Sequence, residues 1–119
     1  MGVLFQGAFW YRGNENVLLT FNQKEFPMSV YLITYDLNSP GQKHGKVLDK
    51  IKAFDAYAPL SESSYAVFSN SSAQAIYELF EPLIDDNDRL LVIPMHKPYY
   101  GFHRGDVIDW MSKHLPTCN

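Results

Sequence analysis

SVYLITYDLN, residues 29–38, is an apolar, β-prone run that ends in a single carboxylate, Asp36. Apolar side chains occupy both alternating sets of positions between residues 30 and 35, which is typical of a strand covered on both faces. An acid at the end of such a strand lies where the backbone leaves the sheet. There the carboxylate can hold a metal ion or a proton while the neighbouring side chains stay packed.

Short β-prone runs and helical periodicities alternate after this strand. Apolar residues recur at positions 47, 51 and 54, which indicates an amphipathic helix. Ser71 with Gln74 has the spacing of a capping box for a second helix. The predicted elements, in chain order, are a strand over 30–35, a helix over 43–54, strands over 57–60 and 64–69, a helix that begins after Ser71 or Ser72 and ends or kinks at Pro82, a strand over 90–93, and a helix from about Asp106.

The predicted order is β-α-β-β-α-β followed by an extra C-terminal helix, which is the split βαβ, or ferredoxin-like, arrangement of an α+β domain. Pro59 predicts that the second strand is an edge strand or carries a bulge. Pro94 is expected to close the fourth strand, and Asp106 is expected to be the N-cap of the last helix.

The length of 119 residues suits one domain with one core, and the 46% of hydrophobic residues is enough to build that core. Residues 28–119 read as a complete domain. Residues 1–27 are expected to be an N-terminal extension, either a tag or the result of a start codon assigned too early. The alternative is that VLLTF, residues 17–21, forms a short added strand.

Charge and cysteine content exclude several classes of protein. The net charge of −3 argues against a nonspecific DNA-coating protein, although not against a nuclease, whose acids lie in its site. No apolar run approaches the roughly 20 residues of a membrane helix, and the N-terminus lacks the pattern of a secretory signal. Cys118 is the only cysteine, so neither an internal disulfide nor a cysteine metal site is expected, and the cytoplasm is the expected location.

Short motifs in the chain resemble known families. YLITYDL at residues 31–37 resembles the opening strand of the small CRISPR-associated ferredoxin-fold proteins that are often called endoribonucleases, and SSYAVF at residues 63–68 resembles their third strand. The opening motif, NDRLLV at residues 87–92 and DWM at residues 109–111 together resemble the SinR family proteins of bacteria and their mobile elements. The resemblance covers about residues 28–115.

The resemblance implies a homodimer in which the acid of the first strand is the metal ligand, so Asp36 is the expected catalytic and metal-binding residue. The apolar second face of the first strand also favours a dimer. Mg²⁺ or Mn²⁺ is the expected cofactor, because two copies of Asp36 near a dimer axis would make up for the single acid.

RNA or double-stranded DNA is the expected partner. An antitoxin RNase of the same fold implies that sequence-selective RNA cleavage is possible on such a scaffold. The alternative is a non-catalytic protein- or RNA-binding module, because the fold alone does not settle the function.

Five polar residues are candidates for contacts to nucleic acid: Lys43, His44, Lys46, Ser63 and Ser64. Each candidate also has a simpler interpretation. The lysines can form a solvated helix face, and the serines can be polar loop residues. Asp36 itself can be a turn residue whose carboxylate bonds to the backbone two residues on.

Three further groups have open alternatives. The acids at 85, 86 and 88 lack the Gly and the distal Glu of an EF-hand, so a polar turn is preferred to a calcium site. The histidines at 96, 103 and 114 match no zinc motif and read as surface or interface residues. The aromatic residues at 99, 100, 102 and 110 can stack on bases, cover a core edge or make a dimer contact.

Overall fold

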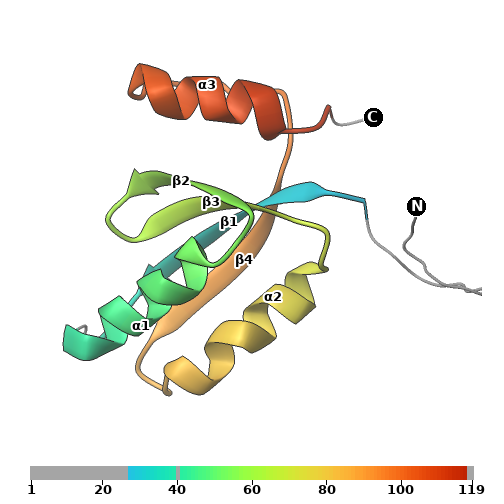
Figure 1. The fold of residues 1–119 in the computed structure, drawn as a ribbon. Helices are drawn as coiled ribbons and strands as arrows, with labels where there is room; N and C mark the ends of the chain where they lie inside the picture. The colour runs from blue at the N-terminus through green and yellow to red at the C-terminus, as the bar shows by residue number, and fades with distance from the viewer. Residues whose placement is uncertain (1–26, 40, 118–119) are drawn as a thin grey trace, which may run out of the picture.

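The strand that contains the opening motif lies inside a four-stranded antiparallel sheet in the computed structural model, which describes residues 27–39 and 41–117 (Figure 1). Its order is β2-β3-β1-β4, so β2 and β4 are the edge strands. The expected N-terminal extension, apart from Pro27, lies outside the described residues. The strands are β1 (Ser29–Asp36), β2 (Ala56–Ser61), β3 (Ser64–Ser69) and β4 (Arg89–Met95).

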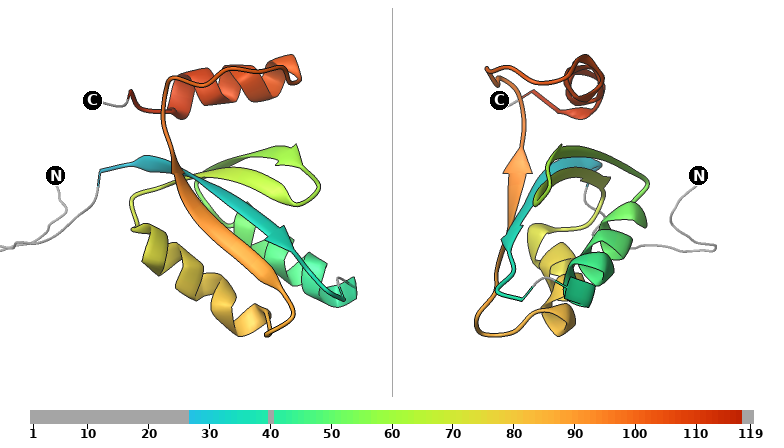
Figure 2. Two further views of the ribbon diagram at one scale, coloured as in Figure 1. Left: turned by 180° about the vertical axis from the view of Figure 1, so that it is seen from behind. Right: turned by 90° about the vertical axis from the view of Figure 1, so that its left-hand side faces the viewer.

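The helices cover the two faces of the sheet unequally. Helices α1 (Gly41–Lys52) and α2 (Ala73–Phe80) lie on one face, and α3 (Gly105–His114) lies on the other (Figures 1 and 2). A short 3-10 helix, η1 (Glu81–Leu83), follows α2. The described chain is therefore an α+β domain, and its strand order is compatible with the ferredoxin-like arrangement expected from the sequence.

The alternation in β1 divides the core into two clusters. Tyr31, Ile33 and Tyr35 face α1 and α2, whereas Val30 faces α3. This division confirms that both faces of the strand are apolar because both face other elements. The buried residues of the first cluster are Tyr31, Ile33, Tyr35, Val47, Ile51, Val67, Ile76, Phe80 and Leu90, and those of the second are Val30, Ala66, Val107, Met111 and Leu115.

Proline positions agree with the sequence prediction in β2 and disagree with it in β4. Edge strand β2 has a register irregularity between Pro59 and Ser61, as expected. Pro94, however, lies within β4 and pairs with Tyr31 instead of closing the strand. Because β4 is an edge strand, the proline nitrogen can face away from β1 without the loss of a ladder hydrogen bond.

The structure selects one of the two predicted N-caps of α2 and contradicts both the predicted capping box and the predicted N-cap of α3. Ser72, not Ser71, is the N-cap of α2, and its hydroxyl accepts a hydrogen bond from the Ala75 N–H at 3.1 Å. Gln74 bonds to Glu78, so no capping box forms. Arg104 rather than Asp106 occupies the N-cap position of α3. Asp106 lies two residues further on, in the first turn of α3, where its carboxylate pairs with Arg104.

None of the helices that the structure describes is long and apolar enough to cross a bilayer.

Candidate functional site at the end of strand β1

Asp36 is the last residue of β1 and pairs in register with Arg89, the first residue of β4. Its side chain is 76% exposed, and its Oδ2 lies 3.7 Å from Nη1 of Arg89. Among the residues that the structure describes, none donates a hydrogen bond to the Asp36 carboxylate. The hydrogen bond to a nearby backbone N–H that is typical of a turn residue is therefore missing. The oxygens of Asp36 are thus free to bind a ligand.

The turn after β1 is held by Asp88 instead. Oδ1 of Asp88 accepts the Asn38 N–H at 2.8 Å, and Oδ2 accepts the Asp85 N–H at 2.9 Å and the Lys43 ammonium at 2.7 Å. This side chain has no exposed surface. The hydrogen bond from Lys43, followed by those from the two backbone N–H groups, lowers the pKa of Asp88 to about 2. We call this group, Asn38, Lys43, Asp85 and Asp88, the Asp88 knot.

The Asp88 knot fastens three segments together. It links the connection after β1 and the start of α1 to the turn before β4. This turn lies 42 to 50 residues later in the chain. Hydrogen bonds to Asp88 and then Asp85 raise the pKa of Lys43, and the Lys43 hydrogen bond lowers the pKa of Asp85. The knot thus fixes the backbone that follows Asp36 and the backbone that precedes Arg89.

Lys43, expected as a nucleic-acid contact, is therefore engaged in two ion pairs within the knot. Lys46 is exposed on α1 and lines none of the hollows around Asp36. Ser64 lies on β3, where its hydroxyl is 3.1 Å from that of Thr34. The two lysines and Ser64 thus lie apart from the Asp36 side chain.

His44 and Ser63 do line a shallow hollow with Asp36. This hollow measures about 180 Å³, and its other lining residues are Tyr35, Leu37 and Glu62. The Ser63 carbonyl accepts the Tyr35 N–H at 2.9 Å, and the Tyr35 hydroxyl donates to the Glu62 carbonyl at 3.2 Å. His44 meets the Tyr35 ring edge-on at 5.8 Å. Burial, with a smaller contribution from Tyr65, raises the pKa of Tyr35 to about 12.

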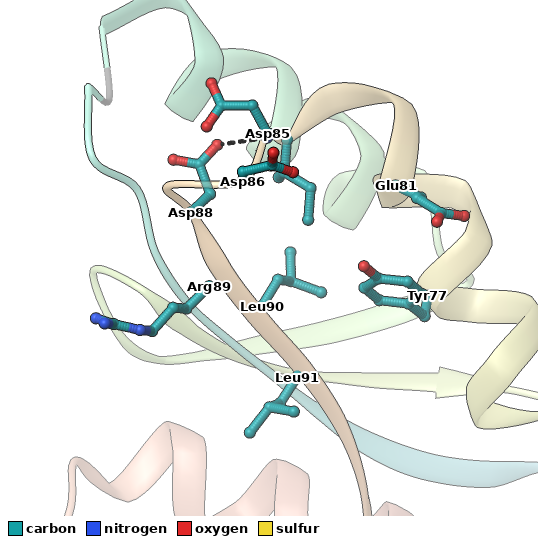
Figure 3. Close-up of a pocket in the computed structure, with 9 residues that line it drawn as sticks. Tyr77, Glu81, Asp85, Asp86, Asp88, Arg89, Leu90 and Leu91 are labelled. Atoms are coloured by element: carbon teal, nitrogen blue, oxygen red, sulfur yellow. Dashed lines mark hydrogen bonds between the residues drawn. The ribbon is translucent and has the colours of Figure 1, made fainter.

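Two further hollows lie on the other side of Asp36. One of about 360 Å³ is lined by Asp36 and Arg89 together with Asn38, Asp86, Asn87 and Asp88. The other, of about 570 Å³, lies between the end of α2 and β4 (Figure 3). In Figure 3 the side chain of Leu90 is directed toward Tyr77 of α2, whereas Leu91 is directed the opposite way. Arg89 extends away from Tyr77.

Sequence reasoning missed Arg89 and Asp88 as parts of this site. Arg89 was detectable only from the pairing of β4 with β1, which the sequence does not specify residue by residue. Asp88 was treated as one of several acids in a polar turn. The turn itself is confirmed, because the Asp88 N–H donates to the Asp85 carbonyl at 3.0 Å and the Asn87 N–H to the Asp85 carboxylate at 2.9 Å.

The outer face of the sheet continues from Asp36 as an uncovered apolar strip, which we define as Leu32, Leu91 and Ile93. Leu32 pairs with Ile93, and Thr34 pairs with Leu91, so all these side chains project to the same face as Asp36. Leu91 is 62% exposed and Ile93 is 41% exposed. Helix α3 covers the other end of this face and leaves the end nearest Asp36 open. The second face of β1 is therefore covered by α3 at one end and open at the end nearest Asp36.

Asp36, Asn38 and Asp86 bring carboxylate and amide groups, the ligand types of a hard cation, to the hollow of about 360 Å³, which the Arg89 guanidinium also lines. Within residues 27–39 and 41–117, however, no three His, Cys, Asp or Glu side chains are placed to hold one metal ion. One copy of the described chain thus offers Asp36 as a ligand, and water, substrate or a second copy would supply the remaining oxygens.

The three C-terminal histidines lie in different places. Nε2 of His103 lies 2.7 Å from the Leu60 carbonyl, Nδ1 of His114 lies 2.8 Å from the Trp110 carbonyl, and His96 is exposed after β4. The His114 ring also stacks on Trp110 at 4.2 Å. His96 agrees with the interpretation as a surface residue, whereas His103 and His114 are half-buried and contact carbonyl groups of the chain itself.

No protein-family model matches the chain.

Proposed function

We propose that the chain is a ferredoxin-like, metal-dependent nuclease that acts on RNA or double-stranded DNA as a homodimer in the cytoplasm. The observation that carries the proposal is the state of Asp36. Its carboxylate is exposed, accepts no hydrogen bond from the described chain, and projects from the same sheet face as the uncovered apolar strip. A carboxylate that merely formed a turn would be bonded to the backbone.

The strand order β2-β3-β1-β4, with two helices on one face, supports the ferredoxin-like assignment. In that arrangement β1 is a central strand, and its end is fixed by neighbours on both sides. The extra helix α3 then accounts for the partial cover of the opposite face.

A two-fold dimer through the apolar strip follows from the chemistry of that face. Isologous interfaces need a self-complementary patch, with apolar residues at the centre and charges at the rim. The strip supplies Leu91 and Ile93, and its end carries one exposed cation, Arg89, and one exposed anion, Asp36. If the two-fold axis runs along β1, such packing would bring the two Asp36 carboxylates to the same end of the interface.

Asp36 and the oxygens of Asn38 and Asp86 are the groups that would hold Mg²⁺ or Mn²⁺. A divalent ion bound there would stabilise charge on a phosphodiester and lower the pKa of bound water. The residues of the chain itself would position the nucleic acid. Arg89 pairs loosely with Asp36 and can bind a phosphate oxygen. Ser63 and His44 border the separate hollow of about 180 Å³ that Asp36 also lines. Lys46 offers a more distant cation for the strand.

A cleavage assay tests the proposal. Labelled RNA and double-stranded DNA are incubated with the wild type, Asp36→Asn and the control Asp49→Asn, at an exposed acid on α1, each with Mg²⁺, Mn²⁺ or a chelator. We expect metal-dependent cleavage by the wild type that Asp36→Asn abolishes. Thermal stability should not change, since an exposed ion pair contributes at most about 1 kcal/mol. Cleavage that persists in Asp36→Asn would contradict the assigned role.

A non-catalytic protein- or RNA-binding module of the same fold is the second candidate function. The observation that favours it is the complete exposure of Tyr100 and Phe102, which lie in the segment between β4 and α3. Under this alternative the wild type would bind a partner but would not cleave nucleic acid under any metal condition.

A further inference from the structure

We propose that the segment 96–104, which we call the aromatic loop, is a stacking site for single-stranded nucleic acid, with Tyr100 and Phe102 as the stacking side chains. The inference rests on the proposed function, because that function makes nucleic acid the expected class of partner. It adds a second contact region, on the segment between β4 and α3, to the site around Asp36.

The structure separates the four C-terminal aromatic residues into two pairs. Tyr99 and Trp110 pack against the core cluster beneath α3. Tyr100 and Phe102 are fully exposed, so neither ring is covered by any described residue. The core-edge interpretation therefore holds for the first pair and leaves the second pair without a structural role in the described chain.

Both ends of the aromatic loop are anchored. At the start, the Lys97 N–H donates to the Pro116 carbonyl at 2.7 Å, and the Lys97 ammonium donates to the Ser112 carbonyl at 2.9 Å. At the end, the His103 Nε2–H donates to the Leu60 carbonyl at 2.7 Å, while its Nδ1 accepts the Arg104 N–H at 2.8 Å. Anchored ends reduce the entropy lost when the exposed rings between them bind a ligand.

The charge of the loop favours an anionic partner. Residues 95–105 contain Lys97 and Arg104, two histidines and no acid, in a chain whose net charge is −3. Arg104 pairs with the exposed Asp106 at 3.0 Å, a surface pair that a phosphate can replace at little cost. Flat aromatic faces next to cations are the features with which proteins bind single strands, since bases stack on the rings and phosphates meet the cations.

The loop also lies at the hairpin that borders the Asp36 hollow. His103 is bonded to Leu60 of β2, and Ser63, two residues beyond the end of β2, is bonded to Tyr35 next to Asp36. A nucleic-acid strand that is bound to the aromatic loop would therefore reach the β2–β3 hairpin before it reaches Asp36. An unpaired strand fits this route because its bases are free to stack, whereas those of a duplex are not.

Fluorescence anisotropy with labelled single-stranded oligonucleotides, in a chelator so that no cleavage occurs, tests the inference. Tyr100→Ala and Phe102→Ala should each weaken binding by roughly 5- to 150-fold, the effect of the loss of one base–aromatic stack. Phe102→Trp should retain binding, whereas Phe102→Leu should lose it. Tyr57→Ala, at an exposed aromatic residue on β2, is the matched control and should bind as the wild type does.

The outcomes distinguish this inference from the proposed function. Normal binding by Tyr100→Ala and Phe102→Ala, or equal binding of Phe102→Leu and the wild type, would overturn the stacking site, because leucine has no ring on which a base can stack. Loss of binding in the loop variants supports the site even if the wild type shows no cleavage. RNA and DNA oligonucleotides of one sequence, each also offered as a duplex, identify which single strand is bound, and tighter binding of the duplex would refute the inference.

Discussion

Leu91→Ala should dissociate the proposed dimer without unfolding the chain. The substitution removes three carbon atoms from a side chain that is 62% exposed in one copy. Burial of a methylene contributes about 0.8 kcal/mol, so complete cover by a partner is worth about 1.5 kcal/mol for the part of Leu91 that is still exposed. A two-fold interface contains two copies of this residue, which gives about 3 kcal/mol, or roughly a 150-fold weaker dimer.

The measurement is sedimentation velocity over a dilution series, with thermal unfolding of the same samples. Leu79→Ala is the matched control, because Leu79 is 46% exposed on α2, on the opposite side of the sheet from the strip. It should leave the dimer affinity unchanged. The reasoning is refuted if the wild type is monomeric throughout the series, or if Leu91→Ala and Leu79→Ala associate as tightly as the wild type.

Three further predictions concern stability and titration. Asp88→Asn should destabilise the chain more than Asp86→Asn in urea unfolding. Because folding lowers the pKa of Asp88 from 3.8 to about 2, the contribution of Asp88 to the free energy of unfolding is present above pH 3.8 and is lost as the pH falls toward 2. This loss should be missing from the acid unfolding curve of the variant. The tyrosinate absorbance should include one group that ionises near pH 12, and this group should be absent in Tyr35→Phe. Since folding raises the pKa of Tyr35 from 10 to about 12, its contribution to stability is complete below pH 10 and is lost between pH 10 and 12. Ser72→Ala should cost about 1 kcal/mol in the free energy of unfolding because it removes the α2 cap, and an unchanged value would contradict the assignment of Ser72 as that cap.

Local patterns in the sequence predicted most of the sheet and helices. Apolar residues on both faces of residues 30–35 identified a covered strand, and the structure confirms that Ile33 and Val30 face different clusters. The errors arose where tertiary position overrides a local rule. Pro94 was expected to end a strand, but an edge position makes its missing N–H harmless.

The candidate site was harder to predict because its parts are distant in the chain. Nothing local to Asp88 indicates that it would bind the N–H of Asn38, fifty residues away. Similarly, adjacent aromatic residues have opposite environments, since Tyr99 packs against the core and Tyr100 is exposed. Such differences depend on where the chain turns after β4, and periodicity does not encode that path.

Pro94 also limits how copies of this chain can associate. A proline whose nitrogen faces the open side of β4 leaves that border without one of the donors that an incoming strand would need. Growth of a continuous sheet from molecule to molecule, the route to fibres, is therefore blocked at this border. Crowded solutions of the protein should accordingly resist β-type polymerisation, and replacement of Pro94 by a residue with a free N–H would remove that protection.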